Sequence, residues 1–115
     1  MPQSYKAAEV NIIDVQEGDI FYRVLNLIGV DVTGKSGKVQ VREESGKPIL
    51  LSFSTDDGTM TCNGTQITLL CEADKMILTK GIYRYDLQIF TTVHDVTTIA
   101  RGNFEVGQDG EQITV

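Results

Sequence analysis

Two alternating segments near the end of the chain constrain its fold more than any other feature. Residues 81–90 read Gly-Ile-Tyr-Arg-Tyr-Asp-Leu-Gln-Ile-Phe, and residues 97–106 read Thr-Thr-Ile-Ala-Arg-Gly-Asn-Phe-Glu-Val. Apolar and polar residues alternate along both segments, which is typical of β-strands that bury one face in a core. The apolar positions of the first segment are Ile82, Tyr85, Leu87 and Ile89. Residues 91–96 connect the two segments, and the pair therefore predicts a β-hairpin.

Shorter segments of similar character precede this hairpin. We expect strands at 8–15, 20–28, 38–43, 49–54, 59–62 and 65–70, with turns between them. Asn63-Gly64 joins the last two of these, and Asn-Gly is a strong signal for a tight hairpin turn. Residues 72–78 are suited to a single helical turn at most. Many short strands separated by frequent turns predict an all-β sandwich or barrel.

The second expected strand has an ambiguous register. One possible inward set is Phe21, Val24 and Leu27, and the other is Ile20, Tyr22 and Val24. A shift of one residue moves every side chain of a strand to the other face of its sheet. The sequence leaves both orientations of this strand open.

The composition is that of one soluble globular domain. The 115 residues suffice for a single core, and 41% of them are apolar. Sixteen acidic against ten basic residues give a net charge of −6, which repels phosphate backbones and disfavours nucleic-acid binding. The chain has no apolar run long enough to span a membrane, and its first residues lead us to expect no signal sequence. We therefore expect synthesis in a cytoplasm, with neither nucleic acid nor membrane as a partner.

The two cysteines are expected to be free thiols. Cys62 is adjacent to the Asn63-Gly64 turn, whereas Cys71 lies far along the following strand. The expected separation is roughly 20 Å at about 3.3 Å per residue. A disulfide requires Cα atoms within about 7 Å of each other.

Residues 29–36, Gly-Val-Asp-Val-Thr-Gly-Lys-Ser, match the phosphate-binding pattern G-x-x-x-x-G-K-[ST]. That loop binds phosphate because a helix begins at its Lys-Ser end and directs its amide groups to the ligand. Here Gly37 and an alternating segment follow instead, which are poor helix formers. We interpret the match as a turn between strands, and a nucleotide site at Gly34, Lys35 and Ser36 remains the disfavoured alternative.

No other segment carries a convincing catalytic or metal-binding pattern. His94 is the only histidine and lies in an expected turn without a nucleophile beside it in the sequence. Asp56-Asp57-Gly58 lacks the spaced ligands and the final Glu of a calcium loop, so we interpret it as a β-turn. Asn63-Gly64-Thr65 matches a glycosylation sequon that we expect to stay unmodified. The sequence predicts no catalytic residue, no metal site and no cofactor.

Tyr83 and Tyr85 flank Arg84, so a strand places both tyrosines on one face. With Asp86 nearby, such a pair could form a platform for a sugar ring. More often it packs in a core, with the hydroxyl groups reaching backbone atoms at the rim. We favour core or rim packing and keep carbohydrate binding as an alternative that requires an exposed tyrosine.

Taken together, these segments resemble the Ig-like module of tailed-bacteriophage structural proteins, as found at the N-terminus of baseplate upper proteins. The resemblance spans residues 17–107 and is strongest in Gly81–Ile89 and in Gly-Asn-Phe-Glu-Val at 102–106. Where the family has Asp-Gly in the final turn, this chain has Val-His-Asp at 93–95. The residues that match the family motifs are Gly18, Asp19, Asp31, Thr33, Gly34, Gly81, Tyr83, Tyr85, Asp86, Gly102 and Phe104.

The resemblance implies an Ig-like antiparallel β-sandwich of roughly seven to eight short strands. Residues 1–16 would form an N-terminal arm and first strand, 17–107 the sandwich, and 108–115 a C-terminal tail of one domain. It implies a non-enzymatic component of a phage virion, made in the bacterial cytoplasm and acting by assembly with other virion proteins, as a homo-oligomer. Tail, baseplate or neck positions are expected. A head-decoration protein, a head-fibre attachment protein or a surface carbohydrate-binding module remains an alternative, and a small-molecule ligand is not expected.

Overall fold

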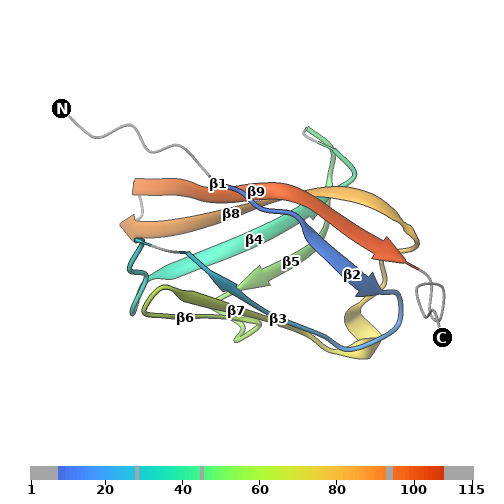
Figure 1. Cartoon of the computed structure of the whole chain (residues 1–115), viewed down its shortest axis with the longest axis horizontal. Coiled ribbons are helices and arrows are strands. Elements are labelled where there is room, and N and C mark those ends of the chain that lie inside the picture. The colour runs from blue at the N-terminus through green and yellow to red at the C-terminus, as the bar shows by residue number, and fades with distance from the viewer. Residues whose placement is uncertain (1–7, 28, 45, 93–94, 108–115) are drawn as a thin grey trace.

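The computed structural model describes residues 8–27, 29–44, 46–92 and 95–107, which form two β-sheets packed face to face (Figure 1). The only helical element in these ranges is the 3-10 turn η1 (Ala73–Lys75). The smaller sheet contains β3 (Phe21–Asn26), β6 (Met60–Asn63) and β7 (Gln66–Cys71). The larger sheet contains β1 (Ala8–Glu9), β2 (Ile12–Gln16), β4 (Ser36–Arg42), β5 (Ile49–Ser54), β8 (Gly81–Thr92) and β9 (Asp95–Gly107).

The strand order is that of an immunoglobulin domain. In the larger sheet β9, β8, β4 and β5 are antiparallel neighbours, and β1 and β2 run parallel to β9 at the opposite edge from β5. The smaller sheet has the antiparallel order β3-β7-β6. These are the places of strands G, F, C and C′ in one sheet and of B, E and D in the other. The expected all-β, Ig-like sandwich is confirmed, with nine strands in the described ranges in place of the expected seven to eight, because the strand expected at 8–15 is divided into β1 and β2.

The β8–β9 hairpin is confirmed and is longer than the sequence suggested. β8 continues to Thr92 and β9 begins at Asp95, so the loop expected at 91–96 was too long. The predicted turn residue His94 lies outside the described residues. The assignment of Ile82 to the inward face was wrong, because Ile82 is 67% exposed whereas Tyr85 and Leu87 are buried. Side chains of a regular strand alternate between its two faces. Ile82 is three positions from Tyr85 and five from Leu87, so it lies on the opposite face from both.

Neither inward set expected for β3 is right as a whole: Phe21 and Leu27 of the first set are buried, but Val24, which both sets share, is 40% exposed. Phe21 and Leu25 are buried, and Tyr22 and Val24 point outward. The strand alternates regularly, but a charged residue, Arg23, occupies the inward position between the two apolar ones. Its guanidinium lies 5.3 Å from the Phe21 ring centroid and donates a hydrogen bond to the carbonyl oxygen of Ile13, while the side chain stays partly exposed at the open side of the sandwich.

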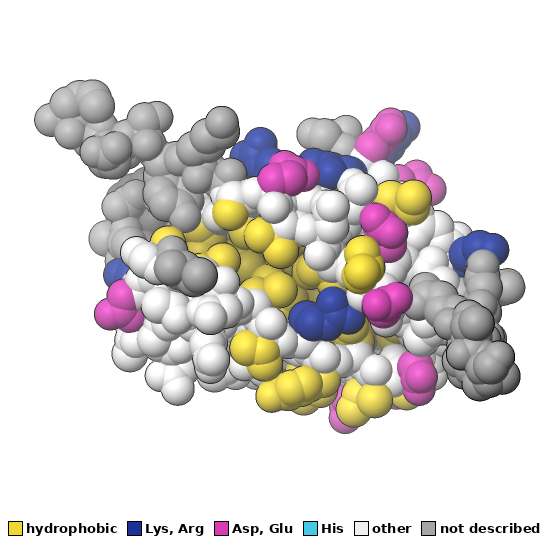
Figure 2. All heavy atoms as spheres, in the orientation of Figure 1, with side chains coloured by type: hydrophobic (Ala, Val, Ile, Leu, Met, Phe, Trp, Pro, Cys, Tyr) yellow, Lys and Arg dark blue, Asp and Glu magenta, His cyan; other side chains and the backbone are white. Residues whose placement is uncertain are grey.

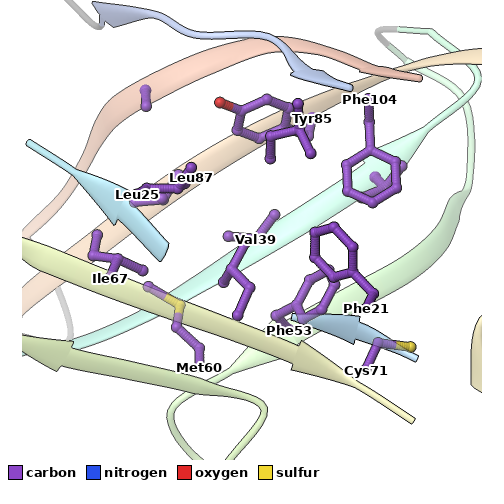
Figure 3. Close-up of a cluster of buried hydrophobic side chains, with 14 of the residues drawn as sticks. Phe21, Leu25, Val39, Phe53, Met60, Ile67, Cys71, Tyr85, Leu87 and Phe104 are labelled. Carbon is purple, nitrogen blue, oxygen red and sulfur yellow. The ribbon is translucent and has the colours of Figure 1, made fainter. Parts of the chain in front are cut away.

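The core lies between the sheets and is built around three aromatic rings from different strands (Figure 3). The ring of Phe21 is 5.7 Å from that of Phe53 on β5 and 5.5 Å from that of Phe104 on β9, and both pairs are tilted. Tilted pairs add stability beyond the area that they bury. Cys62 and Cys71 are both free thiols, as predicted.

Candidate functional site

Gly18 and Asp19 form the turn between β2 and β3. Gly18 has φ 76°, a left-handed conformation that favours glycine, and its N–H donates to the carbonyl oxygen of Met76 at 3.1 Å. The N–H of Asp19 donates to the carbonyl oxygen of Gln16 at 3.2 Å. These contacts tie the β2–β3 turn to the segment after η1, so this motif pair serves the fold.

The loop that resembles a phosphate-binding motif is a turn between β3 and β4, as predicted. Asp31 Oδ1 accepts a hydrogen bond from the Thr33 N–H at 3.0 Å, and this bond lowers the pKa of the exposed carboxyl. Thr33 Oγ1 in turn accepts from the N–H of Gly64 at 2.7 Å, which docks the loop on the β6–β7 turn. β4 begins at Ser36, directly after Gly34-Lys35, so the helix that such a motif needs is absent from this position.

Tyr83 and Tyr85 both pack in the core and donate their hydroxyl protons to backbone carbonyls. The Tyr83 hydroxyl donates to Thr79 O at 2.7 Å, the arrangement known in immunoglobulin domains as the tyrosine corner. The Tyr85 hydroxyl donates to Val10 O at 2.6 Å, and burial, followed by the nearby Glu9 charge, raises the pKa of Tyr85 well above its usual range. The exposed tyrosine that a sugar platform requires is therefore not provided by this pair, which is 8% and 2% exposed.

The last motif residues lie on β8 and β9. Gly81 begins β8, Phe104 is fully buried, and Gly102 lies where the link between β1 and β2 crosses β9. A Cβ atom on Gly102 would overlap the carbonyl oxygen of Val10. Glycine is therefore the one residue that allows this close approach of two backbones.

Asp86 belongs to a charged cluster on the outer face of the larger sheet. Arg42 on β4 and Arg101 on β9 each lie 4.0 Å from its carboxylate, and Arg84 lies 3.6 Å from Glu9. Arg42, Arg84, Asp86, Arg101 and Glu44 line a small hollow of about 110 Å³. Positive and negative groups nearly balance and are partly solvated, so these pairs contribute little stability.

Neither a metal-ligand cluster nor a membrane-spanning helix is found in the described residues. No three His, Cys, Asp or Glu side chains among them are grouped to hold a metal ion. Within the same ranges, no helix has the length and apolar character needed to cross a membrane.

Each of the two sheets has two edge strands. The edges formed by β2 and β3 lie on the same side of the sandwich, and both are protected against pairing with another chain. Asp14, with φ 62°, marks an irregularity in the pairing of β2 with β9, and bulges of this kind hinder edge-to-edge association. Arg23 reaches across from β3 to the backbone of Ile13 at 2.7 Å. Figure 2 shows this side of the molecule, where apolar side chains lie in the hollow between the sheets and charged side chains of both signs surround them.

The other two edges are β6 and β5, and they differ. β6 has only four residues, and very short strands are poor templates for pairing. β5 has six, Ile-Leu-Leu-Ser-Phe-Ser, without charge or proline. An irregularity at Leu50 leaves the part from Leu51 to Ser54 in regular register with β4. Ile49 and Leu50 are 45% and 40% exposed.

An apolar groove lies beside the β5 edge. It has a volume of about 290 Å³ and opens between β5 and the end of β7. The last residue pair between β6 and β7 is Met60 with Leu69, and the Leu70 N–H still donates to the carbonyl oxygen of Thr59 at 2.8 Å. Cys71 lies beyond the end of this pairing. The groove is lined by Ile49, Leu50, Leu51, Ser52, Phe53, Leu70, Cys71 and Lys75.

The β5 edge and its groove are the best candidate for a functional surface, and neither was predicted from the sequence. The one available signal was the absence of charge from 49–54 in a chain with net charge −6. Comparisons with protein-family models, with curated proteins and with solved structures give no match to this chain.

Proposed function

We propose that this protein is a non-enzymatic structural component of a tailed-phage virion and acts by protein–protein assembly. The observation that carries the proposal is the β5 edge, an uncharged strand edge that is regular from Leu51 to Ser54 and lies beside an apolar groove. The Ser54 N–H at the end of this edge already donates to the Thr59 hydroxyl oxygen at 2.9 Å. The rest of the edge offers backbone hydrogen-bonding groups to a neighbouring chain, and the groove offers apolar surface for its side chains.

The roles of the family-motif residues support this proposal. Gly18, Thr33, Tyr83 and Gly102 hold turns, loops and strand crossings together and present no reactive group to solvent. A rigid sandwich of this kind positions strand edges and loops for docking in a symmetric particle. The resemblance of residues 17–107 to phage Ig-like modules supplies the virion context, with a tail, baseplate or neck position preferred to the head.

Quantitative mass spectrometry of purified phage particles from the source of the gene tests the proposal. We expect the protein in particles at a reproducible stoichiometry. A low copy number would favour the tail or neck, and a high one would favour the alternative of head decoration. Absence from particles, with abundant protein in the lysate, would refute the virion role.

The nucleotide alternative has a simple test. The loop at 29–36 has no helix behind it, so we expect ATP and GTP to leave the melting temperature unchanged. A nucleotide-dependent increase that disappears in Lys35→Ala would contradict the structural role proposed for this loop.

A further inference from the structure

We propose that β5 of one chain pairs antiparallel with β5 of a second copy across a twofold axis. The larger sheets of the two chains then form one continuous sheet. This inference deepens the proposed function by naming the partner of the β5 edge, and it rests on that function for its biological role. The pairing is isologous, because the same strand is used by both chains.

The absence of charge on β5 favours a second copy as the partner. The chain carries a net charge of −6, so two copies that approach through most of their surfaces repel each other. None of the six residues of β5 is charged. A β5–β5 contact therefore brings no like charges into opposition within the strands, where they would be destabilising.

The charged residues closest in sequence to the two ends of β5 are complementary when the strands are antiparallel, whereas Glu43 and Glu44, which are also exposed, lie farther from the strand. Lys47 precedes the strand, and Asp56 and Asp57 follow it; all three are exposed. Antiparallel pairing centred on Leu51 or Ser52 brings the beginning of one β5 close to the end of the other. Lys47 of each chain then faces the acidic pair of the other chain, so the twofold axis generates this attraction twice.

The apolar groove supplies the hydrophobic part of the interface. Phe53 and, in part, Leu51 pack toward the inside of the sandwich, and the groove lies on this side of β5. A second β5 added in register extends the same inner face beyond the edge, because paired residues of antiparallel strands lie on the same side of the sheet. The added strand then covers the groove next to Leu70, with the partly buried Leu51 as its inward side chain that is still available for contact.

Light scattering and analytical ultracentrifugation of the full chain, over a dilution series, test the pairing. We expect a dimer that dissociates on dilution. Ser52→Lys places two like charges near the axis and should raise the dimer dissociation constant by about tenfold or more. Thr61→Lys, on the exposed face of the β6 edge, is the matched control and should leave the dissociation constant unchanged.

A charge exchange tests the orientation of the strands. Lys47→Glu should weaken the dimer, and the double variant Lys47→Glu with Asp56→Lys should restore it, because both signs are reversed together. Circular dichroism melting shows whether each variant is folded.

A chain that stays monomeric up to near-millimolar concentration overturns the inference, as does a dimer that Ser52→Lys and Thr61→Lys affect equally. A dimer without rescue in the double variant also overturns it. A monomeric protein that is nonetheless present in particles refutes the β5 pairing alone. A β5-dependent dimer that is absent from particles refutes the virion role alone.

Discussion

The hydroxyl oxygen of Tyr85 lies 2.6 Å from the carbonyl oxygen of Val10, which is 75 positions earlier in the chain. Val10 belongs to the link between β1 and β2, and its N–H donates to the carbonyl oxygen of Arg101 on β9 at 2.8 Å. The link crosses β9 at Gly102, the residue paired with Tyr85. A buried tyrosine and a glycine therefore fix the first strands of the chain on the last hairpin.

Tyr85→Phe should lower the free energy of unfolding by about 1–3 kcal/mol, because the Val10 carbonyl loses its buried donor. Urea denaturation followed by circular dichroism measures the change. Tyr22→Phe is the matched control, since the Tyr22 side chain is 62% exposed, and it should change stability little. Equal effects of the two substitutions would contradict the role given to the Tyr85 hydroxyl.

Gly102→Ala should be destabilising by about 1–3 kcal/mol or more, because the added methyl group overlaps the Val10 carbonyl and must displace the β1–β2 link. Gly81→Ala is the control, because an added Cβ there makes its nearest contact at an ordinary 3.5 Å. Thermal melting of both variants provides the measurement. A Gly102→Ala protein as stable as Gly81→Ala would show that the two backbones are not in close contact.

Asp57 should make stability depend on acidic pH. Hydrogen bonds from the Thr59 hydroxyl (2.6 Å) and N–H (3.0 Å) lower the pKa of the Asp57 carboxyl. A lowered folded-state pKa contributes stability above the unfolded value of about 3.9, and this is lost as the pH falls through the folded value. Solvent screens the exposed carboxylate, so we expect an effect below about 1 kcal/mol.

The comparison for Asp57 uses two variants of the same turn. Asp57→Asn should be less stable than the parent at pH 7, and the difference should shrink on acidification below about pH 4. Asp56→Asn is the matched control, because the contact found at Asp56 is made by its backbone N–H, to Ser54 Oγ at 3.0 Å. Urea denaturation at neutral and acidic pH provides the data, and a difference that persists at acidic pH would argue against the pKa shift.

The two cysteines should react slowly with alkylating reagents in the folded protein. Burial raises the pKa of both thiols, which reduces the thiolate fraction that reacts. Cys62 is partly exposed and Cys71 is buried, so Cys62 should be modified first. Mass spectrometry after timed iodoacetamide treatment, with a urea-unfolded control, measures the rates. Similar rates in folded and unfolded protein would contradict this burial.

The sequence predicted where the strands lie along the chain better than it predicted which side chains point inward and which strands lie at the edges of the sheets. Regular alternation identified the β8–β9 hairpin, and the Asn63-Gly64 turn located β6 and β7. The register of β3 could not be decided because Arg23 occupies an inward position, where its guanidinium donates a hydrogen bond to the carbonyl oxygen of Ile13 on another strand. Only the tertiary fold reveals such a partner.

The candidate surface was missed for a related reason. The run from Ile49 to Ser54 looks like any buried strand, and nothing in its residues says that β5 lies last in its sheet. That position follows from the order of strands that are distant in sequence. The motif residues, by contrast, were visible in the sequence, and the structure places them in turns, crossings and the core, apart from Asp86 in its charged cluster.

The parallel pairing of β1 and β2 with β9 has a consequence for how the chain is made. Ile12 meets Phe104, and Val15 meets Val106, so the first strands gain their partner only from the end of the sandwich. A ribosome must release almost the entire domain before these contacts form. Domains whose contacts are mostly between residues distant in sequence fold in the millisecond-to-second range. The newly made N-terminal strands therefore remain without their pairing partner, β9, until the last hairpin has been translated.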